Sequence, residues 1–283
     1  MALVDGNSTM VNIGLPLGIG IVVLAVVAVL VNRWGSTGHA RDAGIASVRA
    51  ALQLAALAGV LTLVIDRLWA TVLFLVLMSA VAAWTSASRI AKRRPAWSVV
   101  ATCWVPVALP TFVVLAGLAA LGALPLDGFA LIPSAGIMLG NAMTTTTLAG
   151  RRCLEELVAR RGEVEAALSL GFDDVEARTE ICREASATAL LPAIDQTKSV
   201  GIVVIPGAFV GMVLGGASVV DAAIMQLYVM ISILAVGAVA TVLTSGLAAR
   251  GRFEAKDTST STSASKAASK ATSAAKSAPA GRR

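Results

Sequence analysis

Histidine, cysteine and charged residues are all scarce in this chain of 283 residues, and each shortage excludes a class of protein. The single histidine, His39, and three cysteines without a CxxC spacing provide no acid–base pair, metal site or disulfide framework. Charged residues make up only 14% of the chain, too few to cover a soluble domain of this size. The sequence therefore disfavours an enzyme and identifies no cofactor or metal ligands, and we expect the cysteines to be reduced and structural.

Long apolar runs dominate the chain instead. Seven of them are long enough to cross about 30 Å of hydrocarbon as helices, and none shows the period-two alternation of a barrel strand. They are residues 11–31, 43–65, 68–86, 98–121, 129–148, 199–217 and 222–249. The sequence predicts an all-α, polytopic membrane protein with about seven transmembrane helices.

The basic residues set the expected orientation. The net charge of +6 lies in loops and a C-terminal tail, so it marks membrane topology and not a nucleic-acid partner. With the N-terminus outside and seven spans, 22 of the 23 Lys and Arg residues are cytoplasmic, and Arg67 is the exception. A six- or eight-span count would scatter them over both faces. We therefore expect an N-out, C-in protein of the cell (inner) membrane.

Three parts follow from these patterns. Residues 1–10 form a short extracytoplasmic N-terminus, and residues 11–250 form the seven-helix membrane domain. Residues 251–283 are rich in Ser, Ala and Lys without an apolar period. Such a segment buries too little surface to offset its ordering entropy, so we expect a disordered cytoplasmic tail.

One sizeable polar segment, residues 151–198, interrupts the membrane domain. Within it, Glu165, Ala166 and Ala167 are followed by Gly171, the EAA-x3-G pattern of the loop that docks ABC-transporter permeases on their ATPase. Small alanines let a helix approach a partner closely, and a glutamate near a helix start suits the helix dipole. Ile181 stands ten residues after the glycine, as in the longer pattern, but Arg183 and Glu184 replace the Leu-Pro that follows there.

The same segment predicts a helical hairpin. Helix-forming residues run from Cys153 to Leu170, and Gly171 tolerates the left-handed dihedrals that end a helix. Asp173 is placed to cap a second helix, with Glu176 as its capping-box partner. The alternative to an ATPase-coupling element is an ordinary hairpin lying at the membrane interface.

Polar side chains inside the spans are the candidates for a translocation pathway. Asn141 with Thr144 and Thr145, in a run of four threonines, places a polar stripe on the fifth span, and Gln226 lies near the outer end of the seventh. Buried threonines also bond to their own helix, so a packing role stays open for the stripe.

The sixth span contributes further candidates. Pro206 in mid-span is expected to kink the helix, and Gly207 begins a ridge of glycines at every fourth residue that favours close packing. Asp195 and Lys198 lie three residues apart where this span enters the membrane. They are expected to form an interfacial ion pair, or else a gate at the cytoplasmic mouth.

Several stretches resemble one known family. They are GIMLGNAM at 136–143, the EAA loop at 165–171, LPAIDQTK at 191–198, IPG at 205–207 and GMVLGGA at 211–217. Over roughly residues 11–250 the chain resembles the UPF0014 family, which includes bacterial permeases of the iron-export type and plant aluminium-tolerance proteins. The resemblance implies seven spans, a separate ATPase chain and metal-related export, with iron as the first candidate. It assigns no established role to Asn141, Asp195, Lys198, Pro206, Gly207 or Gln226.

The sequence therefore predicts the permease subunit of an ABC transporter, working as a homodimer in the lipid bilayer. No GxxxxGK[ST] motif is present, so ATP hydrolysis is expected on a separate ABC ATPase subunit. The alternative is an ion-coupled secondary transporter, although the span interiors lack the carboxylates that such proteins use. That lack also leaves the substrate open: a metal chelate, a cation held by carbonyl and threonine oxygens, or another solute.

Overall fold

The computed structural model describes residues 15–35, 38, 40–64, 67–91 and 94–253, and throughout these ranges the regular structure is helical. The expected N-terminal segment 1–10 and residues 254–283 of the expected tail lie outside the described residues. The chain divides into two compact units, residues 1–66 and 67–283, which are described here one at a time.

The first unit is a pair of apolar helices. Helix α1 (Leu15–Trp34) and helix α2 (Ala40–Val64) pack against each other. Gly44 contributes to this contact, because a Cβ atom at that position would lie 3.5 Å from Cγ2 of Val29. No residue of α1 is buried within the structure, as expected of a helix whose apolar surface faces lipid.

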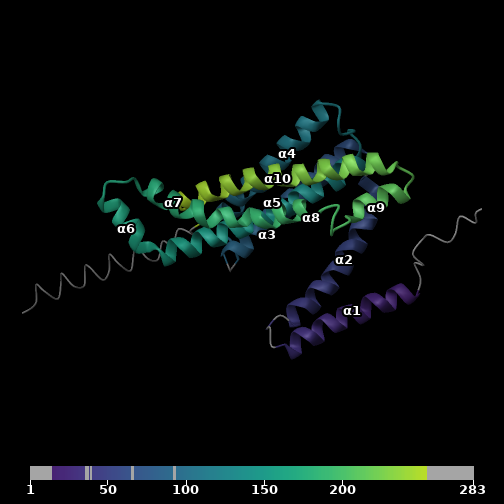
Figure 1. The fold of residues 1–283 in the computed structure, drawn as a ribbon, viewed down its shortest axis with the longest axis horizontal. Coiled ribbons are helices and arrows are strands. Elements are labelled where there is room, and N and C mark those ends of the chain that lie inside the picture. Colours follow the sequence, from purple (N-terminus) through teal and green to yellow (C-terminus); the bar gives the residue numbers. More distant parts are fainter. Residues whose placement is uncertain (1–14, 36–37, 39, 65–66, 92–93, 254–283) are drawn as a thin grey trace, which may run out of the picture. The chain divides into compact units, whose positions relative to one another are not determined.

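The second unit is a bundle built around one long central helix. Helix α5 (Gly128–Ala159) packs against α3 (Leu68–Ala91), α4 (Trp97–Ala120) and α10 (Val219–Ala249), and α10 runs beside it over much of its length (Figure 1). Fully buried alanines occur on these helices, including Ala87, Ala108, Ala142 and Ala240. Small residues let backbones approach closely, which is how membrane helices gain packing energy.

Among the described helices, five are long and apolar enough to cross a membrane, namely α1, α2, α3, α4 and α10. Helix α5 is longer and more polar, with 32 residues that span about 48 Å. It contains the expected fifth span but continues through Arg151 and Arg152 to Ala159. The first helix of the expected polar hairpin is therefore partly a continuation of a membrane helix.

The expected sixth span, residues 199–217, is not a continuous helix. A 3-10 turn, η1 (Thr188–Leu190), leads into α8 (Leu191–Ser199), and α9 (Gly207–Leu214) follows after a break. In the break Gly201 adopts a φ of 81°, and Pro206 caps α9 from an extended conformation. Proline lacks the N–H that a continuing helix needs, so the kink expected at Pro206 is instead a complete interruption.

Two helices form a hairpin at one end of α5. Helix α6 (Arg161–Ser169) stands apart from the bundle, whereas α7 (Asp174–Ala187) returns alongside α5 and α10 (Figure 1). A buried apolar cluster fixes α7 there, and its members include Cys153, Leu157, Ile181, Cys182 and Phe253. The hairpin is therefore attached through α7 and free along α6.

Candidate functional site

The turn of the α6–α7 hairpin is built by a Schellman motif. Gly171 adopts a φ of 94°, its N–H donates to the carbonyl oxygen of Leu168 at 3.0 Å, and the N–H of Phe172 donates to that of Ala167 at 3.2 Å. A left-handed residue flanked by these two bonds defines the motif. The expected helix stop at Gly171 is confirmed.

The second helix begins with the expected capping box. An Asp173 carboxylate oxygen accepts from the N–H of Val175 at 3.1 Å, and Glu176 accepts from the N–H of Asp173 at 3.4 Å. Reciprocal bonds of this kind satisfy N–H groups that the first turn leaves unpaired. The turn is therefore specified locally at both ends.

The EAA residues lie on α6, close to an exposed apolar tip. Glu165 is exposed and pairs with Arg161 at 3.0 Å, Ala166 is exposed, and Ala167 is half-buried. Three large apolar side chains at the turn remain exposed, namely Leu168, Leu170 and Phe172. Apolar side chains gathered at a protruding turn and rimmed by charge are the chemistry of a protein-docking surface.

Ile181 occupies a different environment from the other residues of the pattern. Its side chain is only 5% exposed and belongs to the cluster that holds α7 on α5. It forms part of the floor of a cleft between α6 and α7. Ile181 therefore helps to attach the hairpin to the bundle, whereas the exposed apolar side chains lie at the turn between α6 and α7.

Arg160 connects the three helices of this region. Its guanidinium lies 2.6 Å from a carboxylate oxygen of Glu163 on α6 and 3.0 Å from one of Glu184 on α7. The hydrogen bond from Arg160 lowers the pKa of Glu163. The sequence analysis missed this connection, because Glu184 is 24 residues away along the chain.

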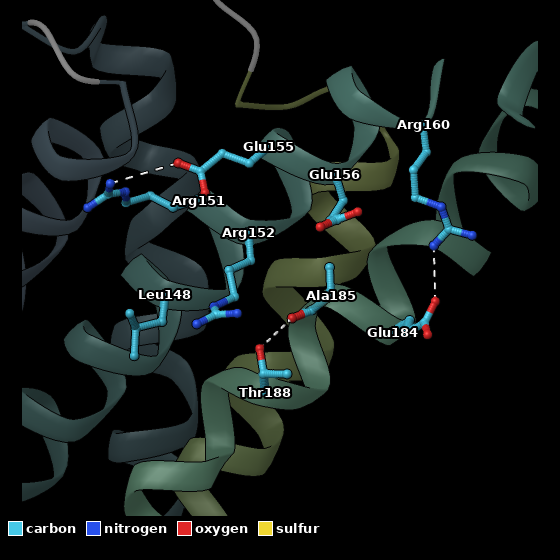
Figure 2. A pocket seen from close by; sticks show the side chains of 9 residues that line it. All are labelled: Leu148, Arg151, Arg152, Glu155, Glu156, Arg160, Glu184, Ala185 and Thr188. Carbon is cyan, nitrogen blue, oxygen red and sulfur yellow. Dashed lines mark hydrogen bonds and ion pairs between the residues drawn. The ribbon is translucent and has the colours of Figure 1, made fainter. Parts of the chain in front are cut away.

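A polar cavity of about 650 Å³ lies between the end of α5 and the end of α7. Figure 2 shows Arg152 between the two helices, with Glu156 and Ala185 beside it and the ion pairs Arg151–Glu155 and Arg160–Glu184 at the edges. Thr188 donates to the carbonyl oxygen of Ala185 at 2.9 Å. The cavity carries both signs of charge, and it could not be predicted from residue spacing because its walls come from separate helices.

The polar stripe on α5 connects neighbouring helices. Asn141 donates to the carbonyl oxygen of Ile233 on α10 at 2.9 Å. Thr147 donates to its own helix at Met143, and Ser86 of α3 donates to the same carbonyl oxygen at 3.0 Å. Thr144 bonds to Gly140 within the helix, and Thr145 is buried. Much of the stripe therefore serves helix packing.

Three buried oxygen atoms in the second unit have no hydrogen-bond partner among the described residues. They belong to Thr146, Gln226 and Tyr228. Gln226 is 5% exposed, so its amide oxygen is removed from bulk solvent. An unsatisfied acceptor inside a membrane protein costs free energy unless water or a solute reaches it.

The remaining pathway candidates lie on α8 and at the start of α9. Asp195 and Lys198 are both exposed on α8, and no ion pair joins them in the described part of the chain. The expected interfacial ion pair is therefore absent from the described structure. An exposed ion pair gains little free energy when it forms, because water already solvates both charges. Pro206 and Gly207 mark the start of α9, and a Cβ at Gly207 would meet no described atom within 4 Å.

The described residues contain no cluster of three or more His, Cys, Asp or Glu side chains that could hold a metal ion. The buried polar side chains of the described residues are hydroxyls and one amide, from Ser, Thr and Gln. Such groups hold cations more weakly than carboxylates do.

Comparison with known proteins identifies the family. Residues 17–253 match the model of "Uncharacterised protein family (UPF0014)". The chain is 34% identical over 230 residues to the rice protein "UPF0014 membrane protein STAR2", covering 80% of this chain and 78% of that one. It is 28% identical to "UPF0014 membrane protein YjkA" of Bacillus subtilis, covering 80% and 90%. It is 25% identical to "Probable iron export permease protein FetB" of Escherichia coli, covering 82% and 90%. No solved structure matches the chain. With the helical bundle, these matches show that the chain is a multi-pass membrane protein of the UPF0014 family.

Proposed function

We propose that this protein is the permease subunit of an ABC transporter that exports iron across the inner membrane. Two copies of the chain would form the pathway, and a separate ATPase subunit would supply the energy. The α6–α7 hairpin is the observation that carries the proposal. It combines the EAA-x3-G pattern with a defined turn and an exposed apolar tip at Leu168, Leu170 and Phe172.

The hairpin is attached to the bundle in a way that would transmit force from its turn to α5. Its tip is held by the Schellman motif at Gly171, α7 is fixed to the bundle by buried apolar residues, and Arg160 joins the end of α5 to both arms. A movement imposed on the tip would therefore reach α5, the central helix of the bundle. This coupling requires the hairpin to face the cytoplasm, which the N-out, C-in orientation provides.

ATP hydrolysis is assigned to the partner subunit, since the chain carries no GxxxxGK[ST] motif. The homodimer is proposed from the transporter class, as one copy supplies few helices with which to enclose a pathway. Iron is proposed because a relative that aligns over 82% of this chain is named a probable iron export permease. The unpartnered oxygens of Thr146 and Gln226 would give passing iron, free or chelated, hard-oxygen contacts.

Capture of the ATPase tests the proposal directly. The permease is coexpressed with a candidate ABC ATPase from the same organism, and the complex is isolated through a tag on the permease. Leu170→Ser with Phe172→Ser should reduce capture at least tenfold, because interface anchors contribute most of a binding energy. Arg183→Gln is the matched control, since Arg183 is exposed on α7 and its nearest carboxylate, on Glu180, lies 4.0 Å away.

Two results would overturn the docking assignment. One is undiminished capture by the double variant, and the other is labelling that places residues of α6 outside the cell. Iron is tested separately by measuring ATP hydrolysis of the reconstituted pair with iron, other metals and metal chelates. Stimulation by another solute and not by iron would keep the coupling assignment and reject the substrate.

A further inference from the structure

A cleft of about 700 Å³ lies between α6 and α7 and shares one lining residue, Arg160, with the polar cavity of Figure 2. Its floor is apolar and includes Ala167, Phe172 and Val175. Three glutamates, Glu163, Glu176 and Glu180, line the cleft as well. We refer to these six residues as the acidic cleft.

The carboxylates of the acidic cleft differ in how they are engaged. Glu163 is held by Arg160, which is itself neutralised by a second contact with Glu184. Glu176 has one long bond to the backbone of Asp173, and Glu180 lies 4.0 Å from Arg183. Residues 161–187 contain seven acidic and three basic side chains. The cleft therefore has unsaturated negative charge above an apolar floor.

The described chain ends in the apolar cluster that also contributes a residue to this cleft. Phe253 is 4% exposed and packs in the cluster that contains Ile181, and Ile181 also lines the cleft. The 30 residues that follow, 254–283, include six Lys or Arg and two acidic residues, a net side-chain charge of +4. A basic segment is thus tethered next to an acidic surface of the same chain.

We propose that the basic C-terminal segment, residues 254–283, binds in the acidic cleft between α6 and α7. A lysine side chain fits a site of this kind, because its aliphatic stem packs on apolar groups while the ammonium reaches a carboxylate at the rim. The intervening Ser and Ala residues are small enough to follow the cleft floor.

The tether makes weak contacts sufficient. Lys256 is three residues beyond Phe253, a reach of at most about 11 Å, and Lys266 is 13 residues beyond it, with a flexible-chain reach of about 20 Å. A short tether gives an effective concentration in the millimolar range. At such a concentration, several ion pairs that are each weak are together sufficient for the tail to occupy the cleft. The contact should weaken in salt, since the charges stay near solvent.

Zero-length cross-linking of the full chain tests this contact. A carbodiimide joins a carboxylate to a lysine amine only where the two touch, and mass spectrometry locates the product. The expected products link Glu176 or Glu180 with Lys256, Lys266, Lys270 or Lys276, and their yield should fall severalfold in high salt. Mixing isotope-labelled and unlabelled chains distinguishes a link within one chain from a link between copies.

Charge-neutral variants provide the matched comparison. Glu176→Gln with Glu180→Gln removes two link sites, so the readout is the link from a tail lysine to Glu163, the remaining carboxylate of the cleft. Its yield should fall at least about fivefold, and glutamine at 176 preserves the capping box. Glu165→Gln removes one carboxylate from α6 at a residue that does not line the cleft, and it should leave the yield of the same link within twofold. Equal losses in both would overturn the cleft as the binding site, as would products that join different copies.

The bilayer is the competing partner for the tail. The cross-linking is therefore run in neutral phosphatidylcholine nanodiscs and in nanodiscs containing phosphatidylglycerol. Products in neutral discs support the proposal, whereas their absence in both kinds of disc would overturn it. Products that appear only in anionic discs would overturn it too, since the contact would then depend on anionic lipid and not on the cleft alone.

Occupancy of the cleft has one consequence that rests on the proposed function. Ala167 belongs both to the EAA pattern and to the cleft, so a bound tail would compete with the ATPase. Neutralising the four tail lysines should then raise ATPase capture. Failure to capture any ATPase would reject the transporter coupling, while the cross-linking result would still decide the tail contact.

Discussion

The side-chain amide of Asn141 on α5 donates a 2.9 Å hydrogen bond to the backbone carbonyl of Ile233 on α10. The two residues are 92 positions apart. This bond crosses the largest helix–helix contact of the second unit. Asn141 therefore has a structural role, whatever solute passes nearby.

Asn141→Leu should destabilise the bundle by about 1 kcal/mol, the range measured for hydrogen bonds between membrane helices. The measurement is reversible unfolding in mixed detergent micelles. Thr144→Val is the control, because the Thr144 hydroxyl bonds only to Gly140 of its own helix, and its loss should be less than half as large. Equal losses from the two substitutions would show that the bond to Ile233 contributes nothing specific.

Gly237→Ala should destabilise the same contact. A Cβ at position 237 would lie 3.0 Å from Nδ2 of Asn141 and 3.0 Å from Cδ1 of Leu190, and overpacking of this kind typically costs about 1–3 kcal/mol. Gly211→Ala is the matched control, since its Cβ would meet no described atom within 4 Å. Alanine there should be neutral or slightly stabilising. The measurement is thermal unfolding of both variants in detergent. A larger loss of stability in Gly211→Ala than in Gly237→Ala would contradict the close approach at Gly237.

The environments of the glycines in the structure show what the spacing of small residues could not predict. The pattern at 207, 211 and 215 predicted a packing ridge, yet Gly207 and Gly211 face open space in the described structure. Side chains of other elements press against Gly150 and Gly237 instead, and neither glycine belongs to a small-xxx-small pair recognised beforehand. Spacing indicates that helices are able to approach closely, whereas the side that does so depends on the rest of the bundle.

Locally determined features were predictable. The stop at Gly171 and the capping box at Asp173 depend on residues within a few positions of each other, and both are confirmed. Most of the expected spans coincide with helices, because apolar length alone defines them. The break at 200–206 was harder to predict, since apolar residues continue through it and Pro206 is compatible with either a kink or a helix start.

Features that depend on distant partners were not predictable. The contacts of Arg160 with Glu184, of Asn141 with Ile233 and of Phe253 with the α7 cluster each join separate elements. The sequence placed Ile181 in a docking pattern, but only the fold shows that it is buried. Residue type and spacing thus indicated the hairpin, while its attachment to the bundle required the structure.

Cys153 and Cys182 should resist alkylation in the folded protein. Both side chains are fully buried, and Sγ of Cys153 lies 3.5 Å from the carbonyl oxygen of Cys182. The hydrogen bond to Cys182, together with burial, raises the pKa of the Cys153 thiol, and the thiolate is the reactive form. The same hydrogen bond lowers the pKa of Cys182, so the protection of Cys182 rests on burial alone. Iodoacetamide at pH 8 should modify both at least tenfold more slowly than a cysteine at the exposed position 169, introduced as Ser169→Cys. Mass spectrometry over a time course supplies the rates, and comparable rates would show that α7 detaches readily from α5.

The contacts of Arg160 should make the stability of the α6–α7 hairpin depend on pH. Arg160 lowers the pKa of Glu163, so this pair stabilises the folded hairpin fully above the ordinary glutamate pKa of about 4.3. The stabilisation is lost as the pH falls through the lower pKa of the folded state. Arg160→Gln removes it at neutral pH, and amide hydrogens of α6 should then exchange about two- to fivefold faster, as expected for an exposed ion pair. Arg183→Gln should leave α6 exchange unchanged at pH 7. In the Arg160→Gln variant, the acid-dependent acceleration seen in the parent protein, after correction for intrinsic exchange rates, should be reduced. An undiminished acid response in that variant would mean that another group than Glu163 controls the hairpin.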